Sequence, residues 1–295
     1  MIAISALIGG VLSFRFAVIS IAIWLVYLVA LVLAHATINL LNDLIDFRLG
    51  ADTGSSPREL YGPHPLGRGL RSTREQLLAI AANGLVAIAA GAALVIYREG
   101  FTLALMLLGA FFVLFYTYPL KRFALGEISM LISYGPLAVG GGYYVLTGAW
   151  SWSAVIASLP FALGATASIM AKHIDKAETD RTNHTYTLPV LMGERASRLT
   201  VIALIVFQFL ITGYLVYLNY FSPVPAVILL ALLPFFRRVL PILRKPRPAE
   251  KPARVPADQW PLWFAIPALR YAQVFGVLYV LGIIADTALR LLGVF

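Results

Sequence analysis

Residues 16–52 read FAVISIAIWLVYLVALVLAHATINLLNDLIDFRLGAD, an apolar stretch that runs directly into amide and carboxylate side chains. Four polar residues recur in it at helical spacing: His35, Asn39, Asn42 and Asp46. At about 100° per residue, these positions fall within an arc of roughly 60° on one face of a helix. Carboxylates at the end of a membrane helix are costly. The polar stripe therefore predicts charged partners or a function at this place.

The rest of the chain has the composition of a membrane protein. Of its 295 residues, 60% are hydrophobic and only 13% are charged, about half the usual share of roughly 25%. Several apolar stretches approach the ~20 residues with which a helix spans a bilayer. We expect an all-α polytopic protein with nine transmembrane helices. The nine predicted segments are 2–14, 16–41, 76–97, 101–118, 127–147, 152–171, 199–218, 223–240 and 263–292.

The net charge of +9 and the lack of cysteine narrow the possible functions. Without cysteine there is no disulfide, thiolate catalysis or Cys-ligated metal. The positive charge is explained by membrane topology, because 19 of the 23 basic residues lie at one set of alternating loops. We therefore predict no nucleic-acid partner.

The same charge pattern predicts the orientation in the membrane. The basic residues concentrate in and beside the loops 47–75, 119–126, 172–198 and 241–262, which share one side if there are nine spans. Basic loops face the cytoplasm. We expect a cell-membrane protein with a cytoplasmic N-terminus and an external C-terminus. The Pro-rich loop 241–262, between helices 8 and 9, is expected to be extended and to lie beside anionic lipid heads.

A second polar cluster follows the sixth apolar segment. Residues 172–181 read KHIDKAETDR and combine carboxylates with basic side chains. Under the predicted topology, this cluster lies on the same side of the membrane as the first one. Oxygen ligands suit Mg²⁺, which keeps waters and takes phosphate oxygens, while Lys and Arg suit a diphosphate. The two clusters therefore indicate a site for a lipid diphosphate, whose head is anionic and whose tail is apolar.

The first cluster resembles the aspartate-rich motif of the UbiA superfamily of intramembrane aromatic prenyltransferases. The resemblance is carried by Asn42-Asp43-x-x-Asp46-Phe-x-x-Gly50-x-Asp52. Its Gly50-x-Asp52 ending is similar to the MenA-like branch, the 1,4-dihydroxy-2-naphthoate polyprenyltransferases. Further matches follow in order: YTYPLK at 116–121, LGE at 125–127, GPLAVGGGYY at 135–144, DR at 180–181 and TLPVLMG at 187–193.

The resemblance implies one transmembrane prenyltransferase domain over residues 1–295, with helices around a central cavity and an active site at its cytoplasmic side. It implies Mg²⁺ bound by ligands among Asn42, Asp43, Asp46, Asp52, Asp175, Glu178 and Asp180. Catalytic roles are implied for Asn42, Asp46, Lys121 and Asp180. Substrate contacts are implied for Asn39, Arg68, Lys176, Arg181, Tyr116, Tyr118, Tyr143 and Tyr144.

The second cluster departs from the family pattern. The family usually has two aspartates four residues apart, whereas Lys176 stands four residues before Asp180. Asp175 replaces the missing carboxylate only if the helix unwinds, because positions five apart lie about 140° apart on a regular helix. Alternatively, Lys176 contacts the diphosphate and replaces the charge of one metal ion. Lys172 and His173 stand where the family usually has asparagines.

The reaction implied is transfer of a polyprenyl group from a polyprenyl diphosphate to an aromatic acceptor. The expected acceptor is 1,4-dihydroxy-2-naphthoate, as in menaquinone-type quinone biosynthesis, and membrane lipids are the other expected partners. A hydroxybenzoate, another phenol or a glycerol phosphate lipid is an alternative acceptor. Since polar stripes also occur in secondary transporters, a transporter is an alternative of another class, as is a non-catalytic homologue that binds a lipid diphosphate.

Overall fold

The computed structural model describes residues 1–49, 64–253, 255–256 and 259–294. These residues form helices, and their only β-type pairing is an isolated bridge between Phe123 and Tyr186. The predicted all-α class is therefore confirmed over the described residues. The helices are α1 (Ile2–Phe14), α2 (Ile21–Arg48), α3 (Thr73–Tyr97), α4 (Thr102–Phe115), η2 (Tyr116–Leu120), α5 (Gly126–Ile132), η3 (Ser133–Gly140), α6 (Gly141–Thr147), α7 (Trp152–Thr182), α8 (Leu188–Tyr217), η4 (Val224–Ala231), α9 (Leu232–Pro234), η5 (Phe235–Val239), α10 (Leu240–Leu243) and α11 (Ala265–Leu291).

Within the described part of the chain, helices cover all nine segments predicted to cross the membrane. Seven helical rods are long and apolar enough to do so. The first segment, α1, has 13 residues, which span only ~20 Å at 1.5 Å per residue. The fifth segment is divided into α5, η3 and α6, with Pro136 inside η3.

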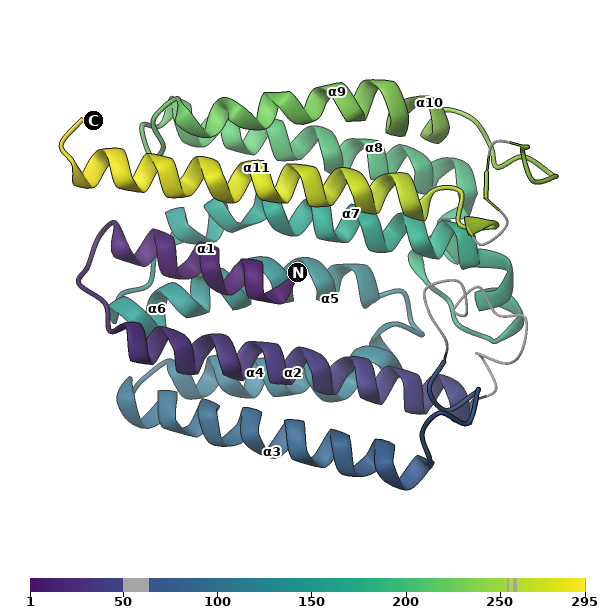
Figure 1. Ribbon diagram of the computed structural model, residues 1–295, viewed down its shortest axis with the longest axis horizontal. Coiled ribbons are helices and arrows are strands. Elements are labelled where there is room, and N and C mark those ends of the chain that lie inside the picture. The colour runs from purple at the N-terminus through teal and green to yellow at the C-terminus, as the bar shows by residue number, and fades with distance from the viewer. Residues whose placement is uncertain (50–63, 254, 257–258, 295) are drawn as a thin grey trace.

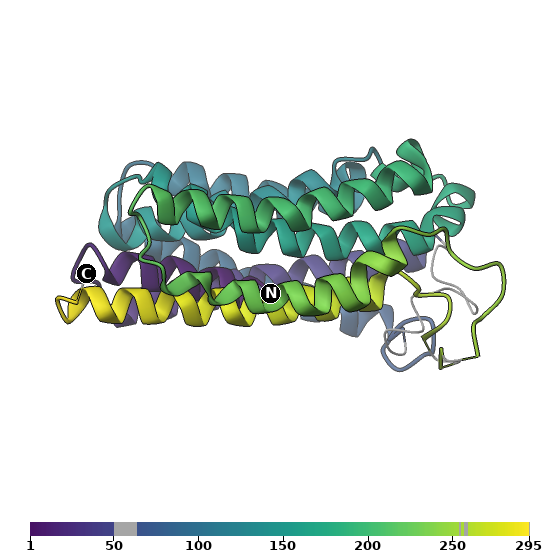
Figure 2. The same ribbon diagram turned by 90° about the horizontal axis from the view of Figure 1, so that it is seen from above.

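The rods run side by side along one common axis, as the two perpendicular views show (Figures 1 and 2). Helix α7 lies in the middle of the bundle, between the part that holds α2, α3 and α4 and the part that holds α8, α9 and α11 (Figure 1). In its apolar window, 83% of the residues are buried, against 6% to 44% in the other six rods. Helix α7 is therefore the core element on which both parts pack.

Small residues allow α7 to take this central place. A Cβ atom at Gly164 would lie 2.5 Å from Nε2 of Gln208 on α8, so the side chain of Gln208 would have to move if any other residue stood at position 164. Gln208 donates to the carbonyl of Pro160 at 2.7 Å and accepts from the hydroxyl of Tyr271 at 3.1 Å. This buried polar contact connects α7, α8 and α11, and all of its groups have partners, as burial in a membrane bundle requires.

Both polar clusters of the sequence are helical rather than loop-like in the described residues. Helix α2 continues to Arg48, beyond the predicted end at 41, and α7 continues to Thr182, beyond 171. The connection predicted over 241–262 is shorter than expected, because α10 extends to Leu243. The two long helices thus carry their polar ends as rigid extensions of membrane-spanning rods.

The opposite end of the bundle has a polar cluster of its own. Asp286 on α11 is fully buried and pairs with Arg15, whose Nη1 lies 3.1 Å from Oδ2. It also accepts from the backbone N–H of Ser222 at 2.7 Å. The guanidinium of Arg15 lies 5.0 Å from the ring centres of Phe16 and Tyr220. These contacts hold the ends of α1 and α11 together far from the polar ends of α2 and α7.

Candidate active site

The predicted polar stripe forms one face of α2 and lines a single cavity. His35, Asn39, Asn42 and Asp46 all lie on its wall. Asn42 donates from Nδ2 to Oδ2 of Asp46 at 3.0 Å, one helical turn further on. The sequence therefore predicted correctly that these four side chains share one face of α2. Asp46, at the carboxylate end of this stripe, lies two residues before the end of the helix at Arg48.

Lys121 is brought to this face by a break after α4. Tyr118 has extended backbone angles (φ −142°, ψ 123°) and precedes Pro119, so the helix cannot continue regularly. The ammonium of Lys121 lies 2.9 Å from Oδ2 of Asp46 and 3.4 Å from Oδ1 of Asn42. Burial lowers the pKa of Lys121, but the charges of Asp46 and Asp180 outweigh burial and hold this pKa above its ordinary value.

Helix α7 contributes the second half of the site. Lys176 lines the cavity, and its ammonium lies 3.9 Å from Oδ1 of Asp180, one turn further on. Asp180 is buried, and its Oδ2 has no hydrogen-bond partner. Asp180 is not itself among the residues that line the cavity, but it lies one helical turn beyond Lys176, which does. The structure thus brings the predicted catalytic residues Asn42, Asp46, Lys121 and Asp180 to one end of the bundle.

One buried pair at this site was missed by sequence reasoning. His173 lines the cavity, and its Nδ1 lies 2.6 Å from Oε1 of Glu127 on α5. Both side chains are buried. Glu127 was noted only as part of a family stretch, and no spacing along the chain relates it to His173. The pair holds an imidazole in a defined orientation on the cavity wall.

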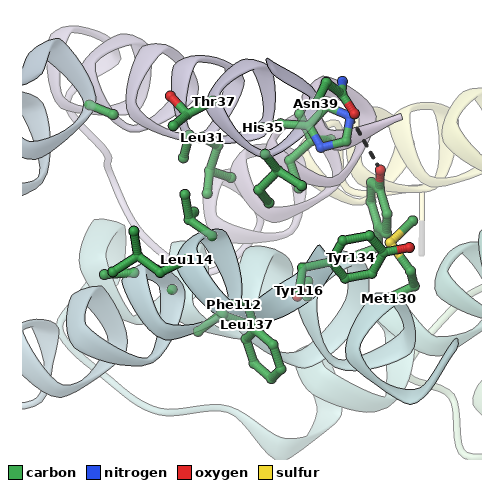
Figure 3. Close-up of a pocket in the computed structure, with 18 of the residues that line it drawn as sticks. Leu31, His35, Thr37, Asn39, Phe112, Leu114, Tyr116, Met130, Tyr134 and Leu137 are labelled. Carbon is green, nitrogen blue, oxygen red and sulfur yellow. Dashed lines mark hydrogen bonds between the residues drawn. The ribbon is translucent and has the colours of Figure 1, made fainter. Parts of the chain in front are cut away.

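The cavity has a volume of about 820 Å³ and changes in character along its length. Its polar end is lined by residues of α2, α7 and the segment after α4, namely Asn42, Asp43, Asp46, Lys121, Lys172, His173 and Lys176. Away from that end, α2, α4 and η3 provide apolar walls, for example Leu31, Phe112 and Leu137 (Figure 3). Tyr134 and His35 face each other across it, with 3.5 Å between Oη and Nε2 (Figure 3). The shape suits an amphiphile with an anionic head and a long apolar tail.

Only some of the residues predicted to bind substrate near this end line the cavity. Tyr116 and Asn39 line the cavity. Tyr118 is 50% exposed, and the guanidinium of Arg122 lies 5.8 Å from its ring centre, so it is not on the cavity wall. Arg68 and Arg181 are exposed and do not line the cavity in the structure.

Two of the residues predicted to bind substrate lie at the end of the bundle opposite Asp46. The ring of Tyr143 is 6.3 Å from that of Phe16, beside Arg15, and the hydroxyl of Tyr144 accepts from the N–H of Phe101 at 3.1 Å. These contacts belong to the end opposite Asp46, because α5–α6 runs through the bundle before it reaches them. The structure therefore does not place Tyr143 or Tyr144 on the wall of the cavity, as their predicted role in substrate binding requires.

Asp175 also has another role than the predicted metal ligand. Its Oδ2 accepts from the N–H groups of Phe264 and Ala265 at 2.9 and 2.8 Å. These N–H groups open α11 and have no partner within the helix. Asp175 is therefore a cap of α11, on the side of α7 away from the cavity. Glu178 is exposed and does not line the cavity, and Asp52 lies outside the described residues.

Comparisons with known proteins identify the family and the fold. The profile of the UbiA prenyltransferase family matches residues 2–284. The chain is 26% identical to 2-carboxy-1,4-naphthoquinone phytyltransferase of Synechocystis sp. over 218 residues, which is 72% of this chain and 68% of the relative. Its fold is similar to the apo structure of a UbiA homologue from Aeropyrum pernix K1, with a TM-score of 0.69, 17% identity and 97% of both chains covered. It is also similar to a UbiA homologue from Archaeoglobus fulgidus bound to DMAPP and Mg²⁺, with a TM-score of 0.60, 17% identity and 96% of both chains covered.

The chain belongs to the UbiA prenyltransferase family, because the family profile matches nearly its whole length. This is a family of transferases. The alternative prediction from the sequence, a membrane transporter, is therefore wrong. The family resemblance that rested on the stretches between residues 30 and 195 extends over both halves of the bundle.

If Asp175 caps α11, its substitution should lower the thermal stability of the protein. We expect Asp175→Asn to lower the free energy of unfolding by about 1 kcal/mol, because the charge-assisted hydrogen bonds to the first turn of α11 become weaker neutral ones. Thermal unfolding of the detergent-solubilised protein measures this loss. Glu178→Gln is the matched control on the same helix and should leave the midpoint unchanged. Equal midpoints for Asp175→Asn and wild type would contradict the capping role.

Proposed function

We propose that this protein is a Mg²⁺-dependent membrane prenyltransferase that moves a polyprenyl group from a polyprenyl diphosphate to an aromatic acceptor, 1,4-dihydroxy-2-naphthoate. The observation that carries the proposal is the continuity of one cavity from a charged end to an apolar wall. A polyprenyl diphosphate has the same two parts in the same order. Membership of the UbiA prenyltransferase family supports the transfer chemistry.

The residues at the polar end fit a magnesium ion. Asn42, Asp43 and Asp46, which line the cavity on α2, would hold it. Asp180 on α7 does not line the cavity but would be a further ligand, because its buried Oδ2 has no hydrogen-bond partner among the described residues. The described residues contain no cluster of three or more His, Cys, Asp or Glu side chains able to bind a metal. Mg²⁺ does not need one, since it usually takes one or two carboxylates and completes its shell with water and substrate phosphate. When bound, it would neutralise charge on the diphosphate.

The basic residues are suited to the departing diphosphate. In the proposed reaction the allylic C–O bond breaks, and its electron pair leaves with the diphosphate. A ring carbon of the acceptor then forms the new C–C bond and loses its proton. Lys121 and Lys176 on the cavity wall would stabilise the developing negative charge. Tyr116 and Tyr134 line the same cavity, where aromatic faces stabilise an allyl cation, and apolar walls keep out water that would trap it.

The acceptor is inferred from two independent similarities. The first motif has the Gly50-x-Asp52 ending of the MenA-like branch. The Synechocystis relative is a naphthoquinone phytyltransferase. Both favour a naphthoate ring, as in menaquinone-type quinone biosynthesis, over a hydroxybenzoate, another phenol or a glycerol phosphate lipid.

The proposed function is tested by transfer of a labelled prenyl group in detergent. We expect Mg²⁺-dependent transfer to 1,4-dihydroxy-2-naphthoate in preference to 4-hydroxybenzoate or a glycerol phosphate lipid. Asp46→Asn and Asp180→Asn should each lower kcat at least about 100-fold, because charge stabilisation at the diphosphate is lost. Glu178→Gln is the control and should keep full activity. Failure of the wild type to prenylate any of these acceptors would contradict the proposal.

The two interpretations of Lys176 lead to different kinetics. We propose that Lys176 contacts the diphosphate, since it lines the cavity and Asp175 is committed to α11. Lys176→Gln should then raise the KM for the donor about tenfold, the effect of losing one charge-assisted contact. The KM for the acceptor should not change. The exposed Lys245→Gln is the control, and an unchanged donor KM in Lys176→Gln would remove this residue from diphosphate binding.

The polar end of the cavity is proposed to face the cytoplasm, with nine spans and an external C-terminus. Support comes from the basic connections, which join the helices at the end that carries Asp46 and Lys121. Alkaline phosphatase and green fluorescent protein fused in turn at the C-terminus test the orientation. We expect an active phosphatase and a dark fluorescent protein, and the reverse pair of results would contradict it.

A further inference from the structure

We propose that a second cavity, between the η5–α10 segment and α11, binds an anionic phospholipid. The cavity has a volume of about 440 Å³ and lies apart from the one described above, with which it shares no lining residue. It lies at the same end of the bundle as the polar site, because α11 begins there against Asp175. The η4 and η5 segments, which belong to the same rod as α9 and α10, pack against α11, and Figure 2 shows this rod beside α11.

Among the described residues, the lining of this cavity carries positive charge only. Arg237, Arg238 and Arg270 line it, and no Asp or Glu does so among the described residues. Within the same described part of the chain, none of the three has a hydrogen bond or an ion pair. Other arginines at this end do, for example Arg198 with Glu194 at 3.2 Å and Arg247 with the carbonyl of Asp175 at 3.1 Å. Three guanidinium groups around one hollow favour an anionic ligand with several oxygen atoms, such as a phosphate.

Apart from Gln259 and Tyr271, the remaining wall of the cavity is apolar. Ile242, Ile266 and Val274 line it, together with Trp263, whose Nε1 is buried without a hydrogen-bond partner. Exposed apolar side chains continue along the neighbouring helix faces, including Leu233, Phe236 and Val277. A phosphate head at the arginines would therefore leave acyl chains lying on an apolar surface. Basic pockets between membrane helices bind acidic lipid heads in this way.

A lipid bound in this cavity would stabilise the contact between the start of α11 and α7. Leu262 and Trp263 line the cavity, and the next residue, Phe264, donates its N–H to Asp175. A ligand packed on Trp263 would therefore hold the segment that leads into α11. Because a ligand that binds only the folded state raises its stability, we expect an increase in the midpoint of thermal unfolding.

The test compares two lipids that differ only in head group, added to the full-length protein in detergent. Phosphatidylglycerol should raise the unfolding midpoint in a saturable way, and phosphatidylcholine with the same acyl chains should not. Arg237→Gln/Arg238→Gln/Arg270→Gln should weaken the apparent affinity for phosphatidylglycerol at least about tenfold, because charge-assisted contacts are lost. The single variant Arg270→Gln should weaken it in part.

The matched control removes the same charge elsewhere at this end of the bundle. Arg195→Gln/Arg244→Gln/Lys245→Gln changes three exposed residues outside the cavity and should keep the wild-type response. An equal loss in both triple variants, or full retention in the first one, would overturn the site. An equal effect of glycerol phosphate, which has no acyl chain, would overturn the lipid assignment. Displacement of phosphatidylglycerol by geranyl diphosphate would also overturn it, in favour of a donor site.

Discussion

A charge can be buried in a membrane bundle only where another charge or a hydrogen bond compensates it, and the ion pair between Lys121 and Asp46 meets this condition at the centre of the site. It joins the end of α2 to the break after α4, two segments 75 positions apart in the sequence. Asn42 contacts both partners. The pair holds the carboxylate of Asp46 in place beside an apolar cavity, where a carboxylate without a partner would be costly.

The second half of the site has a lysine where the family usually has an aspartate. On α7, Lys176 lies near Asp180 and on the cavity wall. A second aspartate at position 176 would add negative charge to an end that already holds Asp43 and Asp46. With lysine there, the protein itself supplies positive charge to an anionic substrate. The carboxylate of Asp175, which the sequence offered as a replacement, is turned away and stabilises the start of α11.

The sequence predicted local features well and long-range ones less well. The stripe from His35 to Asp46 was readable because its residues share one helix, whose phase is set by the backbone. The helix ends at Arg48 and Thr182 were missed, because polar side chains do not end a helix when they face a cavity. The pair of His173 and Glu127 joins two helices, so no spacing along the chain predicts it. Tyr143 and Tyr144 were misplaced because a family stretch gives the order of residues but not how far along the bundle they lie.

We propose that the end of α2 holds a diphosphate through Mg²⁺. A direct binding measurement tests this proposal most simply, because it does not require the acceptor. A labelled, unreactive polyprenyl thiolodiphosphate can be titrated into the detergent-solubilised protein with and without Mg²⁺. We predict saturable binding by the wild type that requires Mg²⁺, is lost in Asp46→Asn and is retained in Asp175→Asn. Binding by Asp46→Asn that equals the wild type in affinity and in its dependence on Mg²⁺ would contradict this account.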